Sequence, residues 1–542
     1  MSDRLLLPAE VAGITFKNPF YVASGPTTRT VSQLIAIEKA GWAAASIKLS
    51  IEPAPYINRH PRYALFPAHN ALGFTAEKRL RYNEALTLIE RGKKSTRDLI
   101  LIANITYSGD RGLDGWVDMA LGFESVGADI VELNMCCPNM SFNVQTTAGN
   151  KDAIEQKTGA SLGTEADAVS EIVRAVKAKI KIPLFVKLTP EGGNIGDVAR
   201  AVYLAGADAV SGTANRLGMP PIDIENPGKS SFHLQDEMGM ACLSGTWLKP
   251  LAQRDTFEMR KIGGPDMPIA ATGGIRNAKD ALEMAMCGAD LIGICTETLI
   301  RGYTFIGDVI AETKAWLHSH GHTRLRDIRD MLVPKIKTAA EMTLYRGYAQ
   351  AVKPDLIAPC MAACPKGVEI QATLKRIAEN DWIRAAELAA GSELCGKCSA
   401  PCETVCVRNR ADSAVGVRDI LLYLRNKADE TGLQIPCRPD GKPAKRNLAK
   451  PSEVLANRTP QNLGSPKGNV TGENVYQSAL RCLRCGCGEG CGVCSELCCE
   501  FAVSLDEANQ IAIDETRCVA CGMCFNRCPN GNIRMVSTGE TL

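Results

Sequence analysis

The chain has no long hydrophobic run and no surplus of charge of either sign. No stretch reaches the 18 apolar residues expected of a membrane-spanning helix, and the chain's start has no secretory signal pattern. Its 62 Lys and Arg residues nearly balance 60 Asp and Glu residues, and a net charge of +2 gives no electrostatic basis for binding nucleic acid. We therefore expect a cytoplasmic protein with no membrane span and no nucleic-acid partner.

Cysteine is scarce before Cys360 and dense after it. A chain of 542 residues is too long to fold around a single hydrophobic core, so we expect more than one domain. The change in cysteine content places the boundary near residue 350, between a large part and two small cysteine-rich parts. The large part also lacks a G-x-G-x-x-G motif after any strand-like segment, which argues against a Rossmann dinucleotide-binding domain.

Short apolar segments alternate with helix-length amphipathic segments along the cysteine-poor part. Seven or eight such units favour an α/β fold, a (β/α)8 TIM barrel, over an open doubly wound sheet. The strand-like segments are 44–49, 99–105, 130–133, 184–188, 209–211, 268–272 and 291–295, and helix-like segments include 166–178 and 278–287.

Composition beyond the barrel predicts several further parts. The segments 338–349 and 368–390 are helix-like, and 431–474 is rich in Pro, Lys, Asn and Gly, as linkers are. The expected parts are a barrel at 1–320, connecting helices at 321–352, a helical iron-sulfur domain at 353–430, a linker at 431–475 and a ferredoxin-like α+β domain at 476–542.

The last part carries the cysteine spacing of a bacterial ferredoxin. Cys518, Cys521, Cys524 and Cys528, followed by Pro529, have the pattern C-x2-C-x2-C-x3-C-P, in which three thiolates hold one cluster and the fourth holds another. A zinc ribbon, the alternative, would have paired C-x2-C knuckles and four ligands only. This spacing indicates a protein that carries electrons.

A second, variant half of the motif precedes the first, with one extra residue in its first gap. Crossed ligation then predicts two 4Fe-4S clusters. Without an export signal, this cysteine usage favours metal in a reducing cytoplasm over disulfides, and an oxygen-sensitive protein. The predicted sets are Cys487, Cys491, Cys494 and Cys528 for one cluster, and Cys498, Cys518, Cys521 and Cys524 for the other.

Two glycine-containing segments late in the barrel suit a phosphate. TIM barrels commonly hold phosphates in the loops after strands 7 and 8, where glycines let backbone N–H groups approach. The segments are Ala271-Thr272-Gly273-Gly274-Ile275 and Gly293-Ile294-Cys295-Thr296. A Gly-Gly turn alone is also common as plain turn geometry.

A wider set of motifs resembles the dihydroorotate dehydrogenases and the flavin barrel of the dihydropyrimidine dehydrogenases. The resemblance spans residues 1–315 in order and spacing. Besides the two glycine segments, the matching stretches are Ala23-Ser24-Gly25, Lys48, Asn70-Ala71-Leu72-Gly73, Ala103-Asn104-Ile105, Glu132-Leu133-Asn134-Met135-Cys136-Cys137-Pro138-Asn139, Val186-Lys187-Leu188-Thr189-Pro190 and Leu243-Ser244-Gly245-Thr246.

The resemblance implies FMN as cofactor. In these families a lysine at the flavin pyrimidine edge stabilises the anionic reduced ring, and Lys187 matches it; a plain salt-bridged strand-end lysine is the alternative. The residues implied to bind FMN are Ala23, Ser24, Gly25, Lys48, Asn104, Lys187, Ser244, Gly245, Gly273, Gly274, Cys295 and Thr296.

The resemblance also implies catalytic and substrate-binding residues. Cys137 matches the cysteine that exchanges a proton with the substrate carbon, with Lys48 as a second catalytic residue; a buried, inert cysteine is the alternative, as we expect for Cys287. Amides suit a cyclic imide, because they pair donor with acceptor. Asn70, Asn134, Asn139 and Asn215 are implied to bind the substrate, and plain turn-forming asparagines are the alternative.

Three departures from the family pattern concern the substrate. The Asn-Thr or Asn-Ser pair expected after the sixth strand is Ala214-Asn215, and the serine expected before the catalytic cysteine is Cys136. The loop from Asn139 to Gly163 is also longer than in the families. FMN is therefore the firmer expectation, and a pyrimidine substrate the weaker one.

The middle cysteines resemble the helical iron-sulfur domain of dihydropyrimidine dehydrogenase and of the glutamate synthase small subunit. The family's C-x2-C pair before the first cysteine is absent here, but Cys482 and Cys485 supply it if the chain folds back. Zinc or a disulfide remains an alternative for this group. One cluster would use Cys360, Cys406, Cys482 and Cys485, and another Cys364, Cys398 and Cys402 with either Cys395 or a non-cysteine fourth ligand, giving up to four 4Fe-4S clusters in all.

Together these features predict an FMN and iron-sulfur oxidoreductase that interconverts a C=C bond and its dihydro form in a small cyclic carbonyl-conjugated substrate. The family's FAD and NADPH domains are absent from this sequence, so a ferredoxin, a flavodoxin or a separate FAD/NAD(P)H subunit would exchange electrons with it. We also expect a homodimer or a place in a hetero-oligomer. The alternatives are an electron-transfer subunit that acts as a conduit without a small-molecule substrate, and an iron-sulfur scaffold with an empty barrel.

Overall fold

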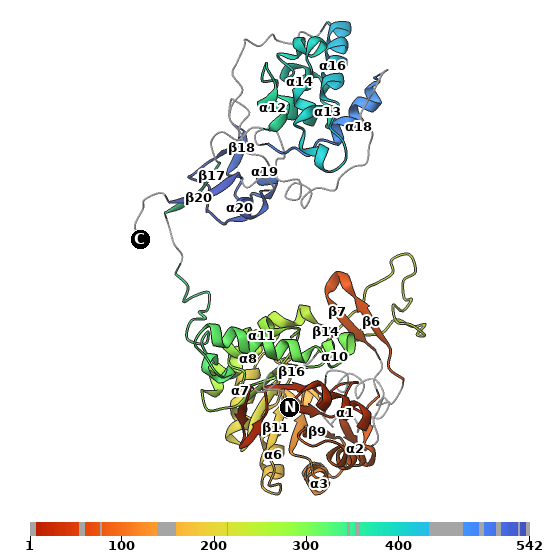
Figure 1. The fold of residues 1–542 in the computed structure, drawn as a ribbon, viewed down its shortest axis with the longest axis vertical. Helices are drawn as coiled ribbons and strands as arrows, with labels where there is room; N and C mark the ends of the chain where they lie inside the picture. The colour runs from red at the N-terminus through yellow and green to blue at the C-terminus, as the bar shows by residue number, and fades with distance from the viewer. Residues whose placement is uncertain are drawn as a thin grey trace. The chain divides into compact units, whose positions relative to one another are not determined.

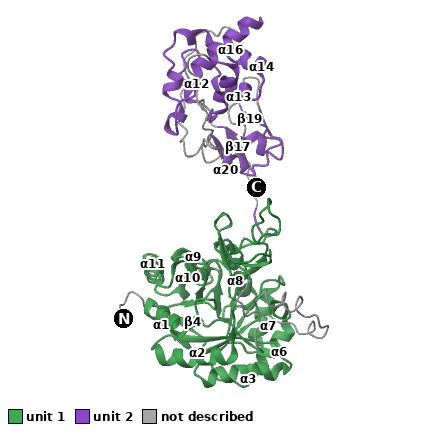
Figure 2. Cartoon of the chain, turned by 90° about the vertical axis from the view of Figure 1, so that its right-hand side faces the viewer, with its two compact units in different colours: residues 1–341 green, residues 342–542 purple. Residues whose placement is uncertain are grey.

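The structure is a computed structural model, and its chain divides into two compact units, residues 1–341 and 342–542 (Figure 2). No helix among the described residues is long and apolar enough to cross a membrane. The residues that the structure describes are 7–53, 60–75, 78–137, 159–213, 215–343, 347–352, 358–432, 470–486, 493–505, 511–528 and 532–537.

The first unit contains a closed barrel of eight parallel strands, as the sequence predicts (Figure 1). Each strand pairs in parallel with the next along the chain, and the last pairs with the first, so the cylinder has no free edge between them. The barrel strands are β3 (Phe20–Val22), β4 (Ala44–Ser46), β9 (Ile100–Tyr107), β10 (Ile130–Asn134), β11 (Leu184–Lys187), β12 (Ala209–Gly212), β15 (Ile269–Thr272) and β16 (Leu291–Ile294).

Helices surround the barrel and bury the outer faces of its strands. Alternate residues point outward into this shell, as Ala103 of β9 and Val131 of β10 do, while Ile102 and Ile130 belong to the cluster inside the barrel. The first hairpin, β1 (Ala9–Val11) and β2 (Ile14–Phe16), packs against that inner cluster. The surrounding helices are α1 (Val31–Ala40), α2 (Tyr82–Ser95), α3 (Gly112–Ser125), α6 (Ala166–Lys177), α7 (Ile195–Leu204), α8 (Lys249–Gly263), α9 (Ala278–Met286) and α11 (Ile306–Ser319).

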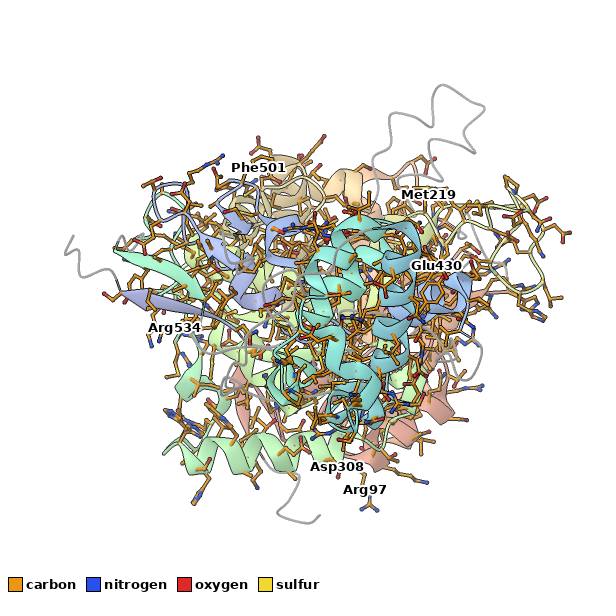
Figure 3. All side chains as sticks on the ribbon, turned by 90° about the horizontal axis from the view of Figure 1, so that it is seen from above. Arg97, Met219, Asp308, Glu430, Phe501 and Arg534 are labelled. Atoms are coloured by element: carbon orange, nitrogen blue, oxygen red, sulfur yellow. The ribbon has the colours of Figure 1, made fainter. Side chains whose placement is uncertain are left out.

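A small antiparallel sheet is inserted into the barrel's loops. Its strands are β6 (Tyr63–Phe66), β7 (Ala71–Phe74), β13 (Arg216–Gly218) and β14 (Ala241–Gly245), in the order β13-β14-β7-β6. It joins the loop after β4 to the loop after β12, because β7 pairs with β14. Met219, just after β13, is more than half exposed (Figure 3).

The cysteine-rich part forms one compact unit with a helical core (Figure 1). Its apolar cluster includes Ile370, Leu374, Leu421 and Leu424, which recur at helical spacing. The helices are α12 (Pro359–Ala363), α13 (Ile370–Ala378), α14 (Trp382–Leu388), α15 (Pro401–Thr404), α16 (Val417–Thr431) and α18 (Gly472–Leu480).

Most of the linker predicted at 431–475 lies outside the described residues, but its last part does not. Residues 472–475 open helix α18, which Thr471 begins with a capping box, and Val475 and Ala479 of α18 belong to the helical core. The predicted boundary at 476 is therefore wrong for this helix, because its apolar face packs on α13 rather than on the ferredoxin-like part.

The helix predicted over 338–349 is also wrong. Within the described residues of 321–352, the regular elements are the short 3-10 helix Leu325–Ile328 and the strand β17 (Tyr348–Val352). β17 pairs antiparallel with β20 (Ile533–Ser537), almost at the end of the chain. A long-range partner decides this conformation, and local sequence carries little trace of it.

The ferredoxin-like part thus uses a strand from before the helical domain. Beside β17 and β20 it has the hairpin β18 (Val503–Leu505) and β19 (Ile511–Ile513), and the short helices α19 (Val493–Leu497) and α20 (Met523–Arg527). Gln350 of β17 is buried, and its Oε1 accepts a hydrogen bond from the Phe525 backbone N–H of α20 at 3.0 Å.

Candidate flavin and iron-sulfur sites

A cavity of about 1040 Å³, including its open mouth, lies at the carboxyl ends of the barrel strands. This is the end at which barrels of this kind carry their chemistry. The inserted sheet closes part of it with Leu72, which belongs to a family-like stretch, and with Tyr63 and Phe74, which no sequence motif included. Of the predicted FMN residues, those that line the cavity are Ala23, Ser24, Gly25, Lys48, Lys187, Ser244, Gly245, Gly273, Gly274, Cys295 and Thr296.

The Gly273-Gly274 turn brings backbone close to this cavity. Both residues have positive φ, +121° and +70°, and a Cβ on Gly274 would lie 2.6 Å from the backbone N of Lys249 in α8. Only glycine fits this turn without moving α8. Across the cavity wall, Thr296 Oγ1 donates to Ser244 Oγ at 3.1 Å and ties the end of β16 to the inserted sheet.

Lys187 presents a buried cation at the end of β11. Burial by itself lowers the pKa of Lys187, but the charges of Cys136 and Glu132, with smaller contributions from Cys295 and Cys137, raise it above its ordinary value. The ammonium therefore stays charged at neutral pH. Such a fixed charge suits the anionic form of a reduced flavin ring.

Glu132 organises the polar floor of the site from inside the barrel. Its carboxylate accepts hydrogen bonds from Ser46 Oγ at 2.8 Å, from Ser211 Oγ at 2.7 Å and from Asn104 Nδ2. Asn104 Oδ1 in turn accepts from Asn134 Nδ2 at 2.9 Å. Asn104 is fully buried in this network and does not line the cavity, contrary to the direct FMN contact that the resemblance implies.

Cys137 lies just after β10 and lines the cavity, half-buried. On one side it packs against Leu49 and Ile51. On another, Arg79 Nη2 donates a hydrogen bond to its Sγ at 3.5 Å. No motif that we recognised in the sequence includes Arg79, and only the fold brings it to Cys137.

The predicted substrate amides divide into three groups. Asn134 and Asn215 line the cavity. Asn70 is exposed and does not line the cavity, and its backbone O accepts a hydrogen bond from Thr246 N at 3.1 Å. Asn139 lies outside the described residues.

In the second unit, four cysteines surround one small, largely apolar cavity of about 370 Å³. They are Cys360, Cys406, Cys482 and Cys485, so the chain does fold back to bring the late C-x2-C pair to the middle group. Gln371 is buried beside them, and its Nε2 donates to Cys485 Sγ at 3.4 Å. A hydrogen bond to sulfur is one way in which a protein tunes a cluster.

A second group joins Cys395 to the other middle cysteines. Burial raises the pKa of Cys395 to about 12, with further contributions from Cys364 and Cys398. Burial likewise raises the pKa of Cys402 to about 12, followed by the charges of Glu403, Cys364 and Cys395. These influences indicate that the thiol of Cys395 lies near those of Cys364, Cys398 and Cys402.

The ferredoxin-like part contains the cysteines of the two remaining predicted sets. Cys498, Cys518, Cys521 and Cys524 line one small cavity. Cys494 and Cys528 belong to one apolar cluster that also contains Cys524 of the other predicted set. Their predicted partners Cys487 and Cys491 lie outside the described residues. Within the described residues, no three His, Cys, Asp or Glu side chains are placed to hold a single metal ion. A 4Fe-4S cubane does not require such a group, because each of its cysteines binds a different iron.

Comparison with known protein families matches two segments of the chain. Residues 6–317 match the model of the dihydroorotate dehydrogenases, and residues 511–534 match that of the 4Fe-4S binding domain. The chain belongs to the dihydroorotate dehydrogenase family. It is a flavin-dependent oxidoreductase with a closed TIM barrel. The family match implies FMN as cofactor, and the second match implies a 4Fe-4S cluster.

Named relatives of this family member cover its barrel. The catalytic subunit of dihydroorotate dehydrogenase B (NAD(+)) from Methanocaldococcus jannaschii is 29% identical over 320 residues, which is 59% of this chain and 95% of that protein. The NAD-dependent dihydropyrimidine dehydrogenase subunit PreA of Escherichia coli K12 is 25% identical over 332 residues, 58% of this chain and 74% of that subunit. The chloroplastic dihydropyrimidine dehydrogenase (NADP(+)) of Arabidopsis thaliana is 23% identical over 350 residues, 60% of this chain and 76% of that enzyme.

The residues present fit FMN. The cavity offers a buried cation at Lys187, hydroxyls at Ser24, Ser244 and Thr296, and the tight glycine turn after β15. Its size and its mixture of apolar walls with a few polar groups are those of a cofactor site. The cysteine groups likewise have the donor chemistry of 4Fe-4S ligands.

Proposed function

We propose that this oxidoreductase interconverts a C=C bond and its dihydro form in a small cyclic carbonyl-conjugated substrate of the dihydropyrimidine or dihydroorotate kind. The observation that carries the proposal is the placement of Cys137 and the buried cation Lys187 in one cavity, together with Asn134 and Asn215. The relatives' names, dihydroorotate and dihydropyrimidine dehydrogenases, support this substrate class.

FMN supplies or accepts the hydride when it is bound. Cys137 gives the matching proton to the substrate carbon in the reducing direction and takes it back in the other. Lys187 keeps a positive charge at the flavin site throughout, because its pKa is raised. Asn134 and Asn215 hold the amide edge of the ring through paired donors and acceptors, and Asn104 fixes Asn134. Lys48, which lines the same cavity, contacts cofactor or substrate.

We assign sixteen cysteines to four 4Fe-4S clusters. The grouping of the described thiols supports Cys360, Cys406, Cys482 and Cys485 as one set, and it favours Cys395 over a non-cysteine ligand in the second. The third cavity supports the set of Cys498, Cys518, Cys521 and Cys524. Cys487, Cys491, Cys494 and Cys528 complete the fourth set on sequence spacing alone.

A separate protein exchanges electrons with the clusters: a ferredoxin, a flavodoxin or an FAD/NAD(P)H subunit. Two relatives support a separate subunit by name, since one is a catalytic subunit and another a subunit of an NAD-dependent enzyme. We further propose a cytoplasmic location, an oxygen-sensitive holoenzyme, and a homodimer or hetero-oligomer, on the cysteine usage and the habits of the family.

Replacing Cys137 tests the proposed chemistry. Cys137→Ala should lower turnover with uracil or dihydrouracil by about 10² to 10⁴, the usual contribution of general acid catalysis, while FMN content stays at the wild-type level. Cys287→Ala is the matched control, because Cys287 is a buried barrel cysteine that does not line the cavity. Full activity in Cys137→Ala would remove Cys137 from the mechanism.

The departures at Cys136 and Ala214 favour a second function, an electron conduit without a small-molecule substrate. A substrate panel with artificial electron carriers separates the two. Flavin redox change with a pyrimidine or dihydropyrimidine supports the enzyme. No response across the panel, combined with rapid oxidation by ferredoxin, supports the conduit.

A further inference from the structure

A buried guanidinium lies against the sulfur proposed to move the proton. Arg79 is fully buried, and its Nη2 donates to Cys137 Sγ at 3.5 Å. Buried arginines are uncommon and usually serve a carboxylate or a carbonyl array. Here one donor of the guanidinium reaches the thiol of Cys137 at the cavity wall, which places a positive charge at the sulfur proposed to move the proton.

One stretch of backbone holds both members of this pair. Arg79 directly precedes β8 (Leu80–Arg81), which pairs in parallel with β5 (Ser50–Glu52), and Leu80 N donates to Leu49 O at 3.0 Å. Leu49 and Ile51 from the same stretch pack on Cys137. The segment after Lys48 therefore fixes the guanidinium and the sulfur relative to each other.

The surroundings of Cys137 strengthen its interaction with the positive charge of Arg79. Cys137 has aliphatic neighbours on one side, so little water is available there to stabilise a charge on its sulfur. An N–H donor carrying a positive charge favours an anionic acceptor, and such charge-assisted bonds are roughly twice as strong as neutral ones. Cys137 becomes anionic once it has given its proton to the substrate carbon.

We propose that Arg79 is a catalytic residue that stabilises the thiolate of Cys137 and fixes the position of its sulfur. This inference rests on the proposed role of Cys137. Arg79 is then a second cation of the site, which acts on the acid Cys137, whereas Lys187 acts on the flavin. Replacing Arg79 by an uncharged residue removes the charged partner of the thiolate. The residues that line the cavity stay the same, because Arg79 is not one of them.

Alkylation of Cys137 in the anaerobic holoenzyme tests this without any substrate. Iodoacetamide reacts with the thiolate, and the labelling rate of the Cys137 peptide is followed by mass spectrometry at one neutral pH. Arg79→Met and Arg79→Gln should each lower that rate about tenfold, the equivalent of one lost charged hydrogen bond, and Arg79→Lys should restore part of it. Arg81→Met, an exposed arginine two residues along, is the matched control and should match the wild type.

FMN content and circular dichroism accompany each measurement. If Arg79→Met does not fold, Arg79→Gln and Arg79→Lys decide the question by the same comparison. Unchanged labelling in a folded, charge-removing variant would overturn the role of Arg79. Because no substrate is present, this result is independent of whether the proposed CH–CH chemistry holds.

Discussion

Lys187 shows how one buried residue sets the character of the flavin site. Its ammonium is buried, and the carboxylate of Glu132 and the sulfur of Cys136 help to raise its pKa. Without this cation, the negative charge of Glu132 near the flavin site is balanced only by neutral hydrogen-bond donors. The site should then stabilise the reduced, anionic flavin less.

Lys187→Met should therefore make the reduction potential of the bound FMN more negative by about 30 to 60 mV, the equivalent of one charged hydrogen bond for a two-electron couple. An anaerobic redox titration followed by flavin absorbance measures this. Lys181→Met, an exposed lysine close before β11, is the control. A potential in Lys187→Met equal to that of the control would show that Lys187 does not act on the flavin.

Cys287 provides a test of pH dependence away from the sites. Burial, followed by the charge of Glu283, raises the pKa of Cys287 to about 11 from an ordinary value of 9.0. Because the folded-state pKa is the higher one, the contribution to stability is complete below pH 9 and is lost as the pH rises through 11.

Urea unfolding of residues 1–341 should therefore show the wild type losing stability faster than Cys287→Ala between these pH values. The difference between the two proteins should shrink as the pH rises. Parallel pH profiles would contradict the assignment of a raised pKa to Cys287.

At the scale of elements, β17 is the unexpected part of the second unit. It comes before the helical domain in sequence, yet it pairs with β20 over five residues and caps α20 through Gln350. The cysteine Cys524 lies in α20, next to the Phe525 N–H that Gln350 binds. The strand therefore supports a proposed cluster ligand that lies far from it along the chain.

A fragment of residues 358–542, which lacks β17, should lose its ferredoxin-type clusters much faster than a fragment of residues 342–542. Losing β17 leaves the edge of β20 and the Phe525 N–H without their partners. Anaerobic decay of the visible iron-sulfur absorbance compares the two. Equal decay rates would show that the β17–β20 pairing has no part in holding the clusters.

The elements also show where sequence reasoning succeeds and where it ends. The barrel strands are short apolar runs buried on both faces, so their composition alone predicts them. By contrast, β17 depends on a partner almost 200 residues away and was predicted as helix. Arg79 was missed for a similar reason: a side chain acquires its role at Cys137 only through the β5–β8 pairing.

At the scale of the whole molecule, the two cofactor types belong to different compact units. The cavity with the flavin residues lies within residues 1–341, and the cysteine groups lie within residues 342–542. The change in cysteine density along the sequence predicted a division of this kind. It placed the boundary near residue 350, whereas the first compact unit ends at Glu341.

Acid extraction of the anaerobically purified full chain tests the central claim most directly. We predict about one riboflavin phosphate per chain, released together with iron and sulfide in equal amounts. Iron and sulfide released without riboflavin phosphate would contradict the assignment of the barrel as a flavin site, and with it the proposed reaction.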